Sequence, residues 1–155
     1  MRVFPQYQGP MAYWPRVEAM PGVHEALSVL RLHYCLILAT NAADSGEALV
    51  RVALRRVGLE PYFHAVLTMR ELGARKPDSA FFEAVLHRIG CPAQEVAMIG
   101  DDYRVDVVGA KRAGLQAIWF NPKALSCPLT SPVHDAEVRA MAELPAAVEE
   151  LHTVG

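Results

Sequence analysis

The chain has 155 residues, of which 52% are hydrophobic and 21% charged, and its formal net charge at pH 7 is −2. This size and composition fit one globular domain with a core of its own. The small net charge predicts neither a nucleic-acid partner nor a membrane partner, and no apolar run is long enough to cross a bilayer. The three cysteines show no metal-ligand spacing, so we expect a reducing, cytoplasmic setting.

The order of predicted elements is regular after an irregular start. Residues 1–21 contain four prolines, and from Gly22 onward hydrophobic residues recur at helical spacing. Asp44 and Glu47 are expected to cap the second helix, which ends at Gly58. The predicted strands span residues 34–39, 63–68, 95–99 and 116–120, and the predicted helices span 23–30, 44–57, 77–89 and 105–113, with a closing helix within 144–151.

Alternating buried strands and amphipathic helices predict an α/β fold, a doubly wound parallel sheet with helices on both faces in three α/β/α layers. In such sheets the binding site lies beyond the carboxyl ends of the strands. The residues that directly follow each strand are therefore the first candidates for function.

Thr40 and Asn41 follow the first predicted strand. A hydroxyl and exposed backbone N–H groups at a strand end can donate hydrogen bonds to phosphate oxygens. A plain turn with a capping side chain is the alternative, and turn chemistry alone favours it.

Lys76 lies directly before the helix that Pro77 and Asp78 begin. At that position its ammonium group could neutralise a phosphate or an acidic nucleophile. The alternative is a solvated loop lysine, as most lysines are.

Residues 100–106, hereafter the acid loop, follow the third predicted strand. Gly100 permits a sharp turn, Asp101 leaves the strand end, and Asp106 returns on the first turn of the next helix. Magnesium takes oxygen ligands and keeps several waters, so one or two carboxylates suffice. Asp106 could instead be a helix-start acid favoured by the helix dipole, and we interpret Asp102 as a plain loop acid.

Three segments in this order resemble the haloacid dehalogenase-like (HAD) hydrolase superfamily, especially its phosphoglycolate-phosphatase-like branch. The resemblance covers roughly residues 20–151, and the Gly-Asp loop with a second Asp five positions on is its most specific part. The segments are Leu36-Ile37-Leu38-Ala39-Thr40-Asn41, Arg75-Lys76-Pro77-Asp78, and Met98-Ile99-Gly100-Asp101-Asp102 continuing through Asp106-Val107-Val108-Gly109-Ala110.

The resemblance implies a magnesium-dependent phosphatase that acts on a small phosphorylated metabolite through a covalent aspartyl intermediate. By position, Thr40 and Asn41 would bind the phosphate, and Lys76 would steady both the phosphate and the nucleophile. Asp101 would be the main metal ligand, supported by Asp106. The substrate and the oligomeric state, including a homo-oligomer, stay open.

The family's nucleophile segment, a strand that ends in Asp-x-Asp, does not occur among the 155 residues. Residues 1–21 resemble the end of the family's helical cap, so we expect an N-terminally truncated chain with a core domain at 22–155. In the family the missing strand is central. We therefore expect the Thr40 strand to pair directly with the strand before the acid loop, or another chain to fill the gap. Residues 2–7 are a poor substitute, since Pro5 cannot donate to a central ladder.

Three hypotheses follow for function. The first is a piece of a working phosphohydrolase, the second a catalytically inactive relative that binds phosphate or a protein, and the third a receiver or flavodoxin-like module. A receiver needs an acid pair near its first strand and a phospho-acceptor after a middle strand, and this sequence shows neither. The missing Asp-x-Asp distinguishes the first two hypotheses.

Overall fold

The computed structural model describes residues 10–13 and 16–154. The expectation for residues 2–7 falls outside this part of the chain. The chain forms two compact units, of which one ends at Gly73 and the other begins at Ala74, and each is described by itself. Across the described residues, no helix has the length and apolar character needed to span a membrane.

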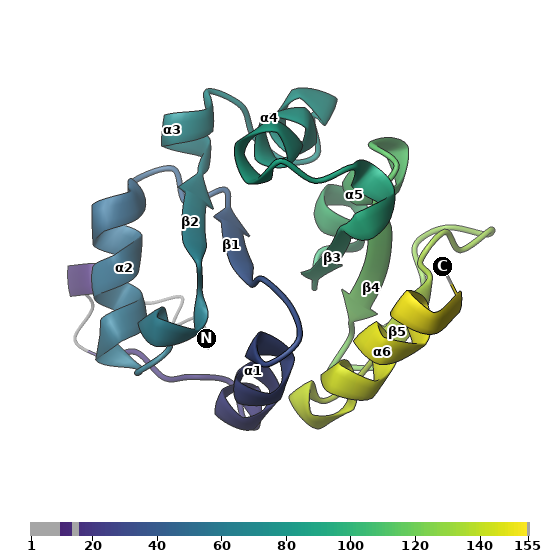
Figure 1. The fold of residues 1–155 in the computed structure, drawn as a ribbon, viewed down its shortest axis with the longest axis horizontal. Helices are drawn as coiled ribbons and strands as arrows, with labels where there is room; N and C mark the ends of the chain where they lie inside the picture. The colour runs from purple at the N-terminus through teal and green to yellow at the C-terminus, as the bar shows by residue number, and fades with distance from the viewer. Residues whose placement is uncertain (1–9, 14–15, 155) are drawn as a thin grey trace. The chain divides into compact units, whose positions relative to one another are not determined.

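The first unit is built on a pair of parallel strands (Figure 1). β1 pairs with β2 in a register that runs from Ile37 opposite Ala65 to Thr40 opposite Thr68. The carboxyl ends of the two strands therefore carry a threonine each. The elements are η1 (Met11–Tyr13), α1 (Val23–Arg31), β1 (Ile37–Thr40), α2 (Glu47–Arg56), η2 (Glu60–Tyr62), β2 (Ala65–Thr68) and α3 (Met69–Leu72).

Helices α1 and α2 bury one stripe each, which is how amphipathic helices of this length gain stability. The helical prediction for α1 is confirmed, because the residues that recur at its helical spacing are the buried ones. On α2, Leu54 is 1% exposed, and the helix contacts β2. The buried stripes consist of Val23, Ala26, Leu27 and Leu30 on α1, and of Val50, Ala53 and Leu54 on α2.

Two predictions for the first unit are wrong. β1 begins at Ile37 rather than at Tyr34, and its four residues are half-buried instead of fully buried. The proposed cap of α2 is absent: Asp44 accepts a hydrogen bond from the Ser45 hydroxyl at 3.1 Å. The N–H of Glu47 donates instead to Glu71 Oε1 at 3.1 Å, because the unpredicted helix α3 brings that carboxylate to the start of α2.

The second unit contains a three-stranded parallel sheet in the order β3-β4-β5 (Figure 1). Gly100 at the end of β3 is paired with Trp119 on β4. Its elements are α4 (Ser79–Ile89), η3 (Ala93–Glu95), β3 (Ala97–Gly100), η4 (Tyr103–Val108), α5 (Gly109–Arg112), β4 (Gln116–Phe120), β5 (Ala136–Val138), η5 (Met141–Glu143) and α6 (Leu144–Val154).

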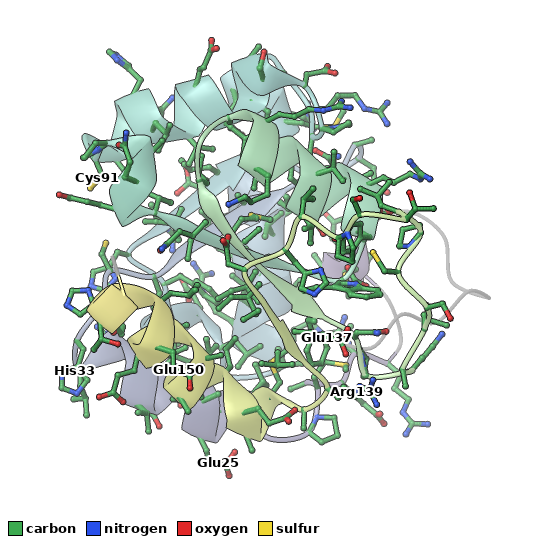
Figure 2. The ribbon with its side chains drawn as sticks, turned by 90° about the vertical axis from the view of Figure 1, so that its right-hand side faces the viewer. Glu25, His33, Cys91, Glu137, Arg139 and Glu150 are labelled. Atoms are coloured by element: carbon green, nitrogen blue, oxygen red, sulfur yellow. The ribbon has the colours of Figure 1, made fainter. Side chains whose placement is uncertain are left out.

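Most predicted elements of the second unit are confirmed. The strand at 116–120 is found at its predicted bounds, α4 ends at Gly90 in the left-handed conformation, and α6 is the expected closing helix. The helix expected at 105–113 is instead a π-helical turn, η4, followed by the short helix α5. β5 was not predicted; its Glu137 pairs at 3.0 Å with Arg139, which directly follows the strand, and Figure 2 labels both residues.

The parallel α/β class is confirmed, but the expected pairing of β1 with β3 is wrong. Among the described strands, β1 and β2 form one sheet, and β3, β4 and β5 form another. The family resemblance implies a further, central strand, and none of the five strands in the described residues ends in Asp-x-Asp. That another chain supplies such a strand stays a prediction.

Candidate functional site

The acid loop begins where β3 ends, at the carboxyl edge of the parallel sheet. Asp101 is exposed there, and no hydrogen bond or ion pair holds its carboxylate within residues 10–13 and 16–154. Its backbone carbonyl, by contrast, accepts a hydrogen bond from the Trp119 indole Nε1 at 3.1 Å. The Asp101 side chain is therefore available to a ligand while its backbone is fixed.

Asp106 and Lys76 form a buried ion pair. The distance from Lys76 Nζ to Asp106 Oδ1 is 2.8 Å, and the two side chains are 9% and 8% exposed. Asp106 Oδ1 is shielded from solvent, so its charge is balanced by Lys76 rather than by water. The structure thus brings together two of the predicted site residues, which are 30 positions apart in the sequence.

Gly100 is required by the position of the Asp106 carboxylate. A Cβ atom at Gly100 would lie 2.3 Å from Asp106 Oδ2 and 2.4 Å from Asp106 Cγ. The carboxylate therefore packs directly onto the backbone at the end of β3. This contact explains the Gly-Asp motif in steric terms: glycine makes room for the second aspartate.

Asp102 has a structural role, which its interpretation as a plain loop acid did not predict. Its Oδ1 accepts the N–H of Val105 at 3.0 Å and so caps the η4 turn. Its own N–H donates to Asp106 Oδ2 at 3.2 Å. An aspartate three residues before a helical amide is a recognisable capping signal.

Lys76 is placed by the packing of α5 against α4. A Cβ atom at Gly109 would lie 2.8 Å from the Phe82 ring and 3.1 Å from Pro77 Cα, so only glycine allows this close approach. Lys76 Nζ also lies 5.9 Å from the centre of the Phe81 ring. Lys76 is thus a buried cation with a defined direction, and the alternative of a solvated loop lysine is wrong.

Thr40 and Asn41 lie at the end of β1 in the first unit. The Thr40 hydroxyl accepts the N–H of Ala42 at 3.1 Å, which is the turn contact considered as the alternative. Its proton is still able to donate to another acceptor. Both side chains are half-buried. Their proposed part in phosphate binding stays a prediction.

An aromatic cluster that the sequence did not indicate supports the acid loop. The Tyr103 ring packs edge-on against Trp119, with ring centres 4.8 Å apart, and lies 5.5 Å from the His134 ring. The Tyr103 hydroxyl accepts N–H groups from Val133 and His134 at 2.9 and 3.3 Å, and it lies 2.9 Å from His134 Nδ1. Burial, with the Cys127 thiol nearby, raises the pKa of Tyr103.

The chemistry of this donor set fits magnesium. Across the described residues no cluster of three or more His, Cys, Asp or Glu side chains is poised for a metal. Magnesium does not need one, because it keeps most of its waters and takes one or two carboxylates. Asp101 offers an exposed carboxylate for direct binding. Both oxygens of Asp106 are engaged, by Lys76 and by the Asp102 N–H, so Asp106 suits an outer position.

Parallel strands, an acid loop at the end of β3 and a buried lysine paired with that loop are the features of the α/β hydrolase fold that the sequence predicted. The model of the haloacid dehalogenase-like hydrolase family matches residues 2–114. The chain belongs to this family, as its sequence motifs indicated.

Curated relatives of this chain include phosphatases. It is 34% identical over 110 residues to the pyrimidine 5'-nucleotidase PynA of Streptococcus pneumoniae, a match that covers 70% of this chain and 45% of PynA. It is also 34% identical over 111 residues to the ribulose-1,5-bisphosphate 5-phosphatase of Halopiger xanaduensis, covering 72% and 46%. The chain therefore spans about half the length of these relatives.

A solved structure of the HAD-hydrolase YfnB from Bacillus subtilis, bound to magnesium, has a similar fold. The TM-score is 0.74 at 27% identity, and the match covers 82% of this chain and 54% of YfnB. The Rossmann-like core expected from the sequence is thus confirmed.

Proposed function

We propose that this chain carries the magnesium-binding and phosphate-binding half of a phosphatase site for a small phosphorylated metabolite. The observation that carries the proposal is the buried Lys76–Asp106 ion pair, whose Asp106 belongs to the same loop as the exposed Asp101 at the carboxyl end of β3. A buried charged pair costs desolvation energy, and such pairs are concentrated where a protein handles charge.

Asp101 would hold the metal directly, and Asp106 would support it from an outer position. Magnesium, when bound, would neutralise phosphate charge as a Lewis acid. Asp106 would also have a second role, because its ion pair with Lys76 holds the ammonium group in place. Without Asp106, Lys76 would lose the carboxylate that balances its buried charge.

Lys76 would stabilise the negative charge of the phosphate and of an attacking carboxylate. Its ammonium group carries one positive charge and three N–H donors, and Asp106 Oδ1 lies 2.8 Å from its nitrogen. Thr40 and Asn41 would donate hydrogen bonds to phosphate oxygens. Charge stabilisation by fixed donors is the main contribution that a protein makes to phosphoryl transfer.

The substrate class follows from what the relatives share. PynA is named for pyrimidine nucleotides and the Halopiger enzyme for a sugar bisphosphate, and both names denote phosphate removal. The part of the chain that matches both is therefore expected to recognise the phosphate rather than the remainder of the substrate.

A second candidate function is binding of phosphate without catalysis. It is favoured by one observation: the sequence has no Asp-x-Asp segment, so the family's covalent nucleophile is not among its 155 residues. Losing the nucleophile removes the covalent pathway itself rather than one part of the rate enhancement.

Hydrolysis of an aryl phosphate in the presence of magnesium tests the proposal. We expect no turnover from the 155-residue chain alone. After fusion to an N-terminal segment that carries the Asp-x-Asp strand implied by the family resemblance, we expect turnover that requires magnesium and is lost in Asp101→Asn.

Two outcomes contradict this proposal. Turnover by the chain alone that is lost in Asp101→Asn would show that the nucleophile is not needed from elsewhere. Phosphate binding with no turnover after fusion, in a protein that folds, would support the non-catalytic alternative.

A further inference from the structure

The peptide unit between Asp101 and Asp102 is held from both sides. Its carbonyl accepts the indole N–H of Trp119 at 3.1 Å, and its N–H donates to Asp106 Oδ2 at 3.2 Å. A peptide unit is planar, so fixing its two ends fixes the backbone torsions on both sides of it. The Asp101 side chain leaves the Cα atom that directly precedes this peptide unit, so the direction of the peptide unit affects the direction of the carboxylate.

Trp119 itself has little freedom. It is 3% exposed, and the neighbouring strand places it next to Gly100 in the sheet. Tyr103 packs edge-on against it at an interplanar angle of 79°, and the His134 ring lies 5.8 Å away. The direction of the indole N–H is therefore set by the packing around it and not by Asp101.

The contacts continue as far as Lys76. Trp119 holds the Asp101 carbonyl, the same peptide holds Asp106 Oδ2, and Asp106 Oδ1 holds Lys76 Nζ. Each contact fixes a different atom of the next group. A change in the direction of the peptide unit would thus reach both the exposed carboxylate and the buried ammonium group.

We propose that Trp119 is a positioning residue, which sets the direction of the Asp101 carboxylate through the Asp101–Asp102 peptide unit. This inference rests on the proposed function for its consequence, which is tighter magnesium binding. Its structural part, the fixed peptide unit, stands on the second unit alone. Trp119 does not touch the metal or the phosphate in this proposal.

The experiment removes the indole N–H and keeps the ring. The chain has two tryptophans, so a Trp14→Phe background leaves position 119 as the only one. Incorporation of β-(3-benzothienyl)alanine there replaces the N–H by sulfur in a bicyclic ring of nearly the same shape. Native tryptophan in the same background is the matched control, and Trp119→Phe is a second variant that needs no unnatural amino acid.

The first readout is metal-free NMR. Without the indole donor, solvent exchange of the Asp102 amide should accelerate at least about 10-fold, and the Asp101 side-chain couplings should average over rotamers. The Ala117 amide, which donates to Asp135 Oδ2 at 2.8 Å, is the internal reference and should change less than about twofold. Unchanged exchange at Asp102, or an equal acceleration at Ala117, would overturn the positioning role.

The second readout is magnesium binding by calorimetry. We expect the benzothienyl variant to bind magnesium about 10-fold more weakly than the control, although no ligand has been removed. Equal affinities in a control that binds magnesium would overturn the inference. A control that does not bind magnesium at all would contradict the proposed function, while the NMR comparison would still decide the positioning role.

Discussion

The carboxyl ends of β1 and β3 both carry predicted site residues, yet they are built differently. At β1 the Thr40 hydroxyl accepts one turn hydrogen bond, from Ala42. At β3 the acid loop is fixed by a buried ion pair, a close-packed glycine and an indole donor. We therefore expect the strand end held by buried charge to be sensitive to single changes and the turn at the other to tolerate them.

The largest effect is expected from separating the buried ion pair. Asp106→Ala leaves the Lys76 ammonium buried without its partner, and we expect a loss of about 4 kcal/mol of unfolding free energy. Urea denaturation measures it. Lys76→Met should also destabilise, and the double variant should cost less than the sum of the two single changes, because no buried charge is left unpaired. Additive effects would contradict a coupled pair.

Gly100→Ala measures how rigidly the acid loop is packed, and a glycine of the first unit serves as its control. The new Cβ would meet the Asp106 carboxylate at 2.3 Å, and we expect a cost of about 3 kcal/mol from overpacking. Gly46→Ala is the control, since its Cβ would meet Glu71 Oε1 at 2.8 Å, the far end of a flexible side chain. Thermal unfolding should show a cost below about 1 kcal/mol for the control. Equal costs would contradict the idea that Asp106 is rigidly held.

Tyr103→Phe tests the hydrogen bonds that join the acid loop to Val133 and His134. The change keeps the ring packing against Trp119 and removes the acceptor for two N–H groups, at Val133 and His134. We expect a loss of about 2 kcal/mol in unfolding free energy, measured by denaturant titration. A variant as stable as the wild type would show that these N–H groups find water instead.

Thr40→Val should have the smallest effect. It removes the hydroxyl that accepts the Ala42 N–H at a half-buried position, so we expect a cost of about 0.5 kcal/mol. Equilibrium unfolding of the variant in urea checks this value. A cost as large as that of Asp106→Ala would remove the contrast between the two strand ends.

Several features of the site were predictable because they depend on local order along the chain. Gly100, Asp101 and Asp106 follow a strand, and short-range motifs of this kind are visible in a sequence. The Gly90 end of α4 and the strand Gln116–Phe120 were predictable for the same reason. Each depends on a period or a punctuating residue within a few positions.

What the sequence did not indicate depends on contacts between distant positions. The pairing of Lys76 with Asp106 and the support of Asp101 by Trp119 join residues 30 and 18 positions apart, and no periodicity predicts them. The cap of α2 was mispredicted because its acceptor is Glu71, which is 24 positions from Glu47. Tertiary contacts override local propensity at these points.

Calorimetry of the 155-residue chain and of its Asp101→Asn and Asp102→Asn variants measures whether the acid loop binds magnesium. The amide side chain in Asp102→Asn would keep an oxygen to accept the Val105 N–H, so this variant is the matched control for charge in the same loop. We expect the wild type to bind magnesium, the control to bind it within about threefold, and Asp101→Asn to bind it at least about 10-fold more weakly. Equal binding by the wild type and Asp101→Asn would contradict magnesium binding by the Asp101 carboxylate.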